Sequence, residues 1–448
     1  MAQRHDNSSL SLYRARAEKC PAVRAFFGTR SPWAWVPSLY LAEAVPYMMV
    51  MTVSVVLYKR LGISNTDIAL YTSWLYLPWV IKPFWSPLVE LFGTKRRWIL
   101  AMEMFVASSL ACVALTIPAD DFFRYSLAFF WLMAFGSATH DTAADGFYMI
   151  GLRQEQQAAF VGVRTTFYRV ATIATKGGLV VLAGTLENRG WDVATAWSVT
   201  FFCTAALFCA LFLYHCFAIP RPAADRPAGR SASPRLGGEF VHSIACFFRR
   251  RDIVSLLAFF LLYRLAEAQL VKMVAPFLLD ARARGGLGLS TAEVGIIYGT
   301  VGVTALMLGG LLGGYAVYRR GLKFWFWIMV VAMHLPDLVF VYLSQALPQN
   351  FHLINLAVAV EQFGYGFGFT AYTLVMLMAS EGPYRAVHYA ICTGFMALGM
   401  MIPAMFSGWL QEHLGYPGFF LWILVATIPG FLVASVVKID PAYGKKKM

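Results

Sequence analysis

Charged residues are scarce in this chain. Asp, Glu, Lys and Arg make up 14% of its 448 residues, whereas a soluble globular protein has about 25%. Hydrophobic residues make up 59%, and apolar stretches of about 20 residues recur along nearly the whole length. The stretches are continuous rather than alternating, which favours helices over the strands of a barrel. The composition therefore indicates a membrane protein with many helical spans.

The sequence also lacks the short motifs of catalytic and metal sites. Its eight histidines show no HExxH or other zinc spacing, and its seven cysteines include no CxxC pair. A Walker loop and a nucleophile elbow are absent as well. These absences argue against an enzyme, a metal site or a bound cofactor. Any energy that the protein uses would then come from a gradient across the membrane rather than from ATP.

Twelve apolar spans follow one another, with a polar linker between the sixth and the seventh. The linker, residues 219–251, contains four prolines and seven arginines, a composition that predicts a flexible surface tether. The predicted order is a basic segment (1–32), a six-helix half (33–218), the linker, a second six-helix half (252–437) and a basic tail (438–448). The spans lie at roughly 34–57, 67–89, 97–117, 124–150, 158–184, 194–218, 253–279, 291–317, 322–345, 351–379, 385–410 and 417–437.

The distribution of Lys and Arg predicts the orientation in the membrane. Of the 37 such residues, 25 fall on the side that carries both termini and the linker, and six fall on the other side. Cytoplasmic loops are rich in Lys and Arg, so both termini are predicted to be cytoplasmic. The net charge of +13 then reflects topology, and nucleic acid is not expected as a partner. The remaining six basic residues lie within spans: Lys82, Arg164, Arg169, Lys176, Arg264 and Lys272.

Two carboxylates, Asp141 and Asp145, interrupt the apolar segment 125–150. They stand four residues apart, on one face of a helix. A charged side chain at the centre of a membrane helix costs on the order of 2.5–3.5 kcal/mol on insertion scales, so both are expected to face a wet cavity or a cation. They are candidates for proton coupling, or alternatively are held in permanent ion pairs by Arg164 or Arg169. The position in the span favours Asp141 as the cavity-facing residue and Asp145 as part of an inner gate.

Three glutamates within spans are further candidates for proton coupling: Glu43, Glu267 and Glu361. For Glu43 and Glu361 the alternative is hydrogen bonding between packed helices. Glu267 stands three residues after Arg264 and is either its salt-bridge partner or a second proton site.

Cations and rings within the spans suit an anionic, sugar-like ligand. Arg169 and Arg264 can each bind a carboxylate or phosphate through two N–H groups. Lys82 either joins them, or forms a structural ion pair or extends to the membrane surface. For the aromatic residues, ordinary packing or a place at the membrane interface is the alternative. The other candidates for substrate binding are His140, Gln269, Gln362, Tyr168, Tyr365, Tyr372 and Trp74.

The loop after the second span resembles the motif of the major facilitator superfamily at that position. Glu90 supplies the acid, Gly93 the turn, and Arg96 and Arg97 the basic residues. The resemblance implies a cytoplasmic gate in which the acid pairs with arginines, although a basic loop is also expected from topology alone. A glycine-rich and arginine-rich counterpart at 309–321 follows six spans later. These two matching loops favour two related six-helix halves with pseudo-twofold symmetry in an all-α membrane fold.

A narrower resemblance rests on several segments in order along the chain. They are similar to signatures of the AmpG-type muropeptide permease family, which is related to acetyl-CoA transporters. Glu43, His140 and His388 depart from that pattern, as do Arg264 and Glu267, and these changes concern the substrate rather than the architecture. The segments are KPFWSP (82–87), SATHD (137–141) with Asp145, YR (168–169), LYRLAEA (262–268), EQFGYGFG (361–368), HYA (388–390) and SGWL (407–410).

The resemblance implies a transporter of the bacterial inner membrane that works as a monomer and imports muropeptides by symport with protons. A carrier of acetyl-CoA or another anionic metabolite is the first alternative. A membrane sensor that binds a ligand without transporting it is the second. The expected partners are a small-molecule substrate of the glycan-peptide class and the lipid bilayer.

Overall fold

The computed structural model describes residues 31–226, 233–382, 384–441 and 443. Every regular element in these ranges is a helix. The predicted basic segment 1–32 lies almost wholly outside the described residues, as does much of the tail 438–448. The all-α prediction is confirmed for the described part of the chain.

The N-terminal half contains six spans, several of them built from more than one helix. Pro46 lies inside the first helix, and a π-helical turn follows it. Pro78 stands in the first turn of α6, after the short break that separates α6 from α5. The elements are η1 (Pro32–Ala34), α3 (Val36–Met48), η2 (Met49–Val53), α4 (Ser54–Arg60), α5 (Asn65–Trp74), α6 (Leu77–Leu91), α7 (Lys95–Thr116), α8 (Phe122–Gly151), α9 (Gln154–Ile173), η3 (Ala174–Leu179), α10 (Val180–Asn188) and α11 (Val193–Ala218).

The C-terminal half repeats this plan. Its third span is interrupted by a 3₁₀ turn that contains Pro336, because proline lacks the N–H that a continuous helix needs. The elements are α13 (Ile253–Leu262), α14 (Leu265–Leu279), η5 (Arg282–Arg284), α15 (Thr291–Val294), η6 (Gly295–Gly302), α16 (Val303–Arg320), α17 (Leu322–His334), η7 (Leu335–Asp337), α18 (Leu338–Ala346), α19 (Phe351–Ala379), α20 (Arg385–Ala426) and α21 (Ile428–Val436).

Eight of the described helical stretches are long and apolar enough to cross a membrane by length and composition. One of them contains two spans, because Gly415, with φ 66° and ψ 171°, breaks α20. The pair α5 and α6, together with α8 and α19, complete the twelve predicted spans. α8 packs on α7, α19 packs on α16, and both α5 and α6 pack on α20.

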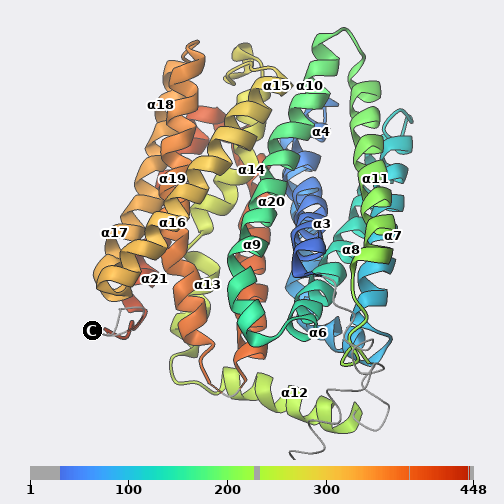
Figure 1. The fold of residues 1–448 in the computed structure, drawn as a ribbon. Helices are drawn as coiled ribbons and strands as arrows, with labels where there is room; N and C mark the ends of the chain where they lie inside the picture. The colour runs from blue at the N-terminus through green and yellow to red at the C-terminus, as the bar shows by residue number, and fades with distance from the viewer. Residues whose placement is uncertain (1–30, 227–232, 383, 442, 444–448) are drawn as a thin grey trace, which may run out of the picture.

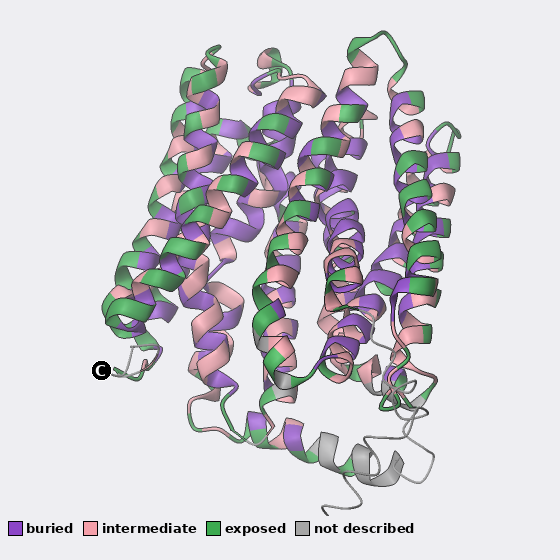
Figure 2. Ribbon diagram, in the orientation of Figure 1, coloured by how far each residue is buried: buried purple, intermediate pink, exposed green. Residues whose placement is uncertain are grey.

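The two halves stand side by side (Figure 1). A separate helix, α12 (Ser233–Phe248), crosses one end of the bundle, which we call the linker end. The opposite end, where α10, α15 and α18 lie, we call the closed end. Exposed residues line the outer faces of the helices and buried residues the inner faces (Figure 2), as expected for spans whose outer side chains contact lipid.

The described part of the linker, residues 219–226 and 233–251, includes a helix that the sequence did not predict. It contains α12, and the Phe247 ring of this helix is fully buried. That ring lies 5.3 Å from the ring of His388 on α20, and Phe248 lies 6.2 Å from Phe395. The prolines and arginines of the linker obscured this short apolar stretch in the sequence, and its aromatic residues fix the helix to the C-terminal half.

Side-chain bonds join the two halves at the closed end. Lys59 at the end of α4 forms an ion pair of 2.7 Å with Asp280, which follows α14. The amide of Asn65 donates to the Gln411 side-chain oxygen on α20 at 2.5 Å. All four side chains are buried or nearly so, so these bonds exclude water from the seam.

A second seam at the closed end joins α10 to α15. The hydroxyl of Thr291 donates to the Glu187 carboxylate at 2.7 Å. The backbones approach so closely that a Cβ added at Gly184 would lie 2.2 Å from the amide nitrogen of Ala292. Glycine is therefore needed at position 184 for this end to close.

Candidate functional site

The N-terminal half presents a cluster of paired charges. Lys82 on α6 forms an ion pair with Asp141 on α8. Arg164 on α9 pairs with Asp145 at 2.9 Å, and the hydroxyl of Tyr40 donates to the same carboxylate at 3.1 Å. The charged side chains are about a fifth to a third exposed, so they form a partly accessible surface of this half, which we call the charged wall, rather than part of a dry core.

These contacts identify the partners of both acids in this conformation, and proton coupling by either acid stays a prediction. Asp145 pairs with Arg164, as one of the alternatives proposed. Lys82 pairs with Asp141 instead of extending to the membrane surface. Asp145 contacts only residues of its own half among the bonds above, so a gating role for it across the halves remains a prediction.

Glu43 lies deeper in the same wall. Its side chain is 8% exposed, and Oε2 has no hydrogen-bond partner among the described residues. It is close enough to interact electrostatically with Asp141, Asp145, Arg164 and Lys82. The first span therefore contributes a carboxylate to the cluster. Its Oε2 makes no hydrogen bond to a neighbouring helix among the described residues.

His140 does not join this cluster. Its Nε2 lies 3.5 Å from Glu103 on α7, and the same carboxylate oxygen accepts from Nδ1 of His215 at 2.5 Å. His215 reaches on to the hydroxyl of Ser38 at 2.8 Å. His140, Glu103 and His215 are at most 2% exposed, so this buried network ties helices together behind the cleft.

The C-terminal half opposes the charged wall with a cation set among aromatic rings. Arg264 stands at the junction of α13 and α14, is 7% exposed, and donates to the hydroxyl of Tyr365. Its guanidinium carbon lies 4.7 Å from the ring centroid of Phe369 and 5.9 Å from that of Tyr372. Such contacts hold a guanidinium by its face.

The two walls meet at the centre of the molecule. Arg264 interacts electrostatically with Tyr47 and Tyr76 of the N-terminal half. Tyr168 on α9 is close enough to interact with Tyr47 and with Arg169. Tyr47 thus lies near Arg264 and Tyr365 of one half and near Tyr168 of the other.

Arg169 differs from the other intramembrane arginines. It is half-buried, and it forms no side-chain hydrogen bond or ion pair with any residue that the structure describes. A guanidinium with free N–H groups beside a tyrosine is available to an anionic ligand.

The other candidates for substrate binding have more structural contacts. Gln269 accepts from the indole N–H of Trp422 at 3.0 Å, and Gln362 donates to its neighbour Glu361 at 3.0 Å. The hydroxyl of Tyr372 donates to the carbonyl of Phe260 at 2.8 Å. Trp74 is 39% exposed and takes no part in the contacts of the central residues given above.

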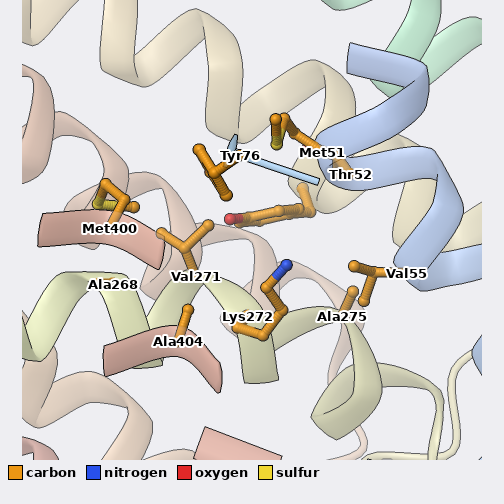
Figure 3. Close-up of a pocket in the computed structure, with 11 residues that line it drawn as sticks. Met51, Thr52, Val55, Tyr76, Ala268, Val271, Lys272, Ala275, Met400 and Ala404 are labelled. Atoms are coloured by element: carbon orange, nitrogen blue, oxygen red, sulfur yellow. The ribbon is translucent and has the colours of Figure 1, made fainter. Parts of the chain in front are cut away.

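A small cavity lies between the halves and is lined by residues of both, among them Tyr76 and Lys272 (Figure 3). Its volume for a water-sized sphere is about 10 Å³, far below the roughly 300–1,000 Å³ of pockets for small molecules. The amino group of Lys272 points into it and donates to Thr72 at 2.9 Å. This cavity marks the closed side of the site and is too small for a disaccharide.

The predicted gate residues lie at the linker end. Gly93 has φ +84°, which suits glycine at the turn between α6 and α7. Arg96 donates to the carbonyls of Cys216 and Ile219 at the end of α11, while Arg97 is exposed. The side chain of Glu90 lies outside the described part of the structure, so its pairing with the arginines stays a prediction.

Three buried residues were not identified from the sequence. They are the acids Glu103 and Asp337, and His215, which pairs with Glu103. The signal for Glu103 was present, because an acid in the middle of an apolar span needs a partner. Asp337 follows Pro336, and a proline followed by an acid within a span marks a broken helix with a polar group beside it.

The geometry agrees with what the chain resembles. An anhydromuropeptide permease of Escherichia coli strain K12 is 24% identical over 365 residues, which cover 80% of this chain and 70% of that protein. A putative transporter AmpG 4 of Rickettsia conorii is 24% identical over 409 residues, covering 88% and 94%. Both support the resemblance to AmpG-type permeases.

Solved structures support the fold. A bacterial homologue of the human lysosomal transporter Spinster, in an inward-facing and unoccupied conformation, matches with a TM-score of 0.65 and 16% identity, covering 91% of this chain and 96% of that one. The nucleoside transporter NupG matches with a TM-score of 0.65 and 17% identity, covering 90% and 98%. These likenesses show the fold of the major facilitator superfamily, and the long apolar helices are those of a multi-pass membrane protein.

The BT1 family model matches residues 45–428. This range extends from the first span, just after Glu43, to the start of α21, and so includes Lys82, Asp141, Asp145, Arg164 and Arg264. The chain therefore belongs to the BT1 family.

Proposed function

We propose that this protein is a secondary active transporter that imports a muropeptide or a related sugar-peptide fragment of the cell wall together with protons. The observation that carries the proposal is the pairing of two unlike walls. Tyr47 of the first span interacts electrostatically with Asp141 of the charged cluster and with Arg264 of the other half, so the cluster and the arginine with its aromatic neighbours lie on either side of this tyrosine.

This arrangement suits a ligand that is part sugar and part peptide. Aromatic rings such as Tyr365 and Tyr168 offer faces for sugar rings, and the guanidinium groups of Arg169 and Arg264 bind carboxylates. The lactyl and peptide carboxylates of a muropeptide are anionic, which matches the two arginines. The anhydromuropeptide permease among the relatives transports, by its name, a ligand of this class.

The bonds between the halves at the closed end support transport by alternating access. The predicted orientation puts the linker end in the cytoplasm, so the closed end faces outward and the site in this conformation is shielded from the outside. Transport then requires the bonds of Asn65 and Glu187 across the halves to break and re-form. We place the protein in a bacterial inner membrane, with both termini cytoplasmic, as a monomer without a cofactor.

Uptake into proteoliposomes tests the proposal. Labelled anhydromuropeptide should accumulate when the outside is acidified, and a proton uncoupler should abolish the accumulation. Accumulation of acetyl-CoA instead, insensitive to the uncoupler, would establish the exchanger of anionic metabolites. Saturable binding of the muropeptide with no flux of any of these compounds would establish a sensor.

Replacing Arg264 tests the ligand site itself. Arg264→Lys keeps the charge but loses the planar group that lies against Phe369, so the KM for uptake should rise about tenfold, equivalent to about 1.4 kcal/mol. Arg320→Lys is the matched control, because that arginine lies 4.9 Å from the exposed Phe324 ring at the surface. Equal KM values for the two variants would contradict the assignment.

A further inference from the structure

Three buried carboxylates meet inside the C-terminal half, and we call them the acid trio: Glu267 on α14, Asp337 in η7 and Glu361 on α19. Their carboxylate oxygens lie within 4.8 Å of one another. Each side chain is only 1% exposed. The broken helix at η7 is what brings Asp337 to the other two.

The trio lacks the partners that buried carboxylates normally have. Both oxygens of Glu267 and both oxygens of Asp337 are buried without a hydrogen-bond partner among the described residues. Within the same part of the chain, Glu361 accepts only from the adjacent Gln362, at 3.0 and 3.2 Å. Asp141 and Asp145 of the N-terminal half, in contrast, each have a basic partner. Three unscreened negative charges at this distance are not sustainable in an apolar interior.

The charged groups around the trio leave a deficit of one positive charge. Arg264 and Lys176 are the described cations close enough to interact with Glu267, and Lys176 also interacts with Glu361. Two cations against three carboxylates give a net charge of −1, which one monovalent cation balances. The other titratable groups shown to interact with the trio are phenols, which are neutral at physiological pH: Tyr298 on η6 and Tyr365 on α19.

Lys176 belongs to the other half of the molecule. It lies in η3, and its Nζ is 4.4 Å from the ring centroid of Tyr298 on η6. The backbones of η3 and η6 touch, since a Cβ at Gly299 would lie 2.2 Å from the carbonyl oxygen of Lys176. This contact belongs to the seam between the halves. When the halves separate at the closed end, the ammonium group moves away from the trio.

We propose that the acid trio binds the proton that is coupled to transport, and that Lys176 controls its release. This inference rests on the proposed function. In the present conformation one bound proton balances the net charge of −1. When the closed end opens, the trio loses a positive neighbour and a second carboxylate binds a proton from outside. When the seam re-forms, the ammonium group returns and this second proton dissociates. Only an O–H bond forms and breaks, and the order of events is that of import with a proton.

Two uptake measurements on the full-length protein in proteoliposomes separate coupling from substrate binding. The first is accumulation of labelled anhydromuropeptide driven by an imposed pH gradient. The second is exchange of labelled for unlabelled compound without a gradient. Glu267→Gln, Asp337→Asn and Glu361→Gln should still exchange but lose at least about nine-tenths of the pH-driven accumulation. Glu155→Gln, an exposed position on α9, is the matched control and should retain both.

Lys176 provides an independent test if an acid-trio variant fails to reach the membrane. Lys176→Met should keep the proton bound, so that exchange persists and accumulation is lost, whereas Lys176→Arg should restore accumulation. Wild-type protein without pH-driven accumulation would refute the proposed function itself. If Asp337→Asn or Lys176→Met accumulates the compound as well as the wild type does, the role of the acid trio is refuted while the proposed function stands. Accumulation driven by a Na⁺ gradient at equal pH would overturn the assignment to a proton.

Discussion

Lys82 and Asp141 form an ion pair between α6 and α8, in the charged wall of the N-terminal half. The pair matters because each charge is about three-quarters buried, with exposed fractions of 26% and 21%. Neither residue can lose its partner without leaving a poorly hydrated charge. The pair therefore also fixes the position of α6 against the helix that carries Asp145.

A double-mutant cycle should show that these two charges act as a unit. We expect Asp141→Asn and Lys82→Met each to lower the thermal stability in detergent, and the combined variant to lose less than their sum. Contacting pairs of this kind have coupling energies of about 0.5–3 kcal/mol, measured by the melting temperatures of the four proteins. Asp252→Asn is the control, since it removes a surface pair with Arg250 that is 44% exposed at the carboxylate. Additive effects of the two mutations would refute the coupling.

The closed end should open when the α10–α15 seam receives an extra carbon. Gly184→Ala places a Cβ against the backbone of Ala292, whereas Gly178→Ala, its control on the same span, meets nothing within 4 Å. We expect a cysteine introduced at Thr72, which bonds Lys272 between the halves, to react about tenfold faster with an external maleimide in Gly184→Ala. That change corresponds to a shift of about 1.4 kcal/mol in the conformational equilibrium. An unchanged rate would show that this seam does not hold the closed end shut.

The fold was predictable because long apolar runs leave few choices. A backbone in lipid must satisfy its own hydrogen bonds, so the runs had to be helices, and the linker between two sets of six spans indicated two halves. Breaks within spans were harder to predict. η7 depends on Pro336 inside an apolar run, and α12 depends on aromatic contacts such as Phe247 with His388, which local composition does not encode.

The candidate site was predictable in its residue types and less so in its partners. Buried acids such as Asp141 stand out in an apolar sequence, because their cost requires a cation or a cavity. Which cation pairs with which acid depends on the rotation and depth of each helix, so Lys82 and Arg164 could not be assigned from spacing. His140 was misleading for the same reason, since its helix face turns it towards Glu103 and away from the cleft.

The network around Glu103 should prove structural rather than functional. Glu103→Ala removes the partner of His215 at a fully buried position, and leaving one member of a buried pair costs about 3–5 kcal/mol. We expect a clear fall in melting temperature and in the yield of folded protein. The KM of whatever protein remains should be unchanged. A raised KM with a normal melting temperature would instead place Glu103 in the substrate pathway.

Arg164 and Arg169 on α9 form a natural comparison, because one is paired and the other has no ion pair among the described residues. Arg164→Gln frees Asp145 and Tyr40 from their cation, so we expect it to lower both the melting temperature and the uptake rate. Arg169→Gln removes a guanidinium without a described ion pair or hydrogen bond. It should leave the free energy of unfolding within about 0.5 kcal/mol of wild type, while the KM for the muropeptide rises.

Removing the negative charge of the ligand distinguishes two roles for Arg169: binding of the anion and packing. A muropeptide analogue with its peptide carboxylates amidated should be taken up with nearly the same KM by wild type and Arg169→Gln, because the group that the guanidinium binds is absent. The unmodified compound should distinguish the two proteins by about tenfold, as expected for about 1.4 kcal/mol from a charge-assisted hydrogen bond. If the variant loses affinity equally for both compounds, Arg169 shapes the cleft and does not bind the anion. A loss of stability equal to that of Arg164→Gln would lead to the same conclusion.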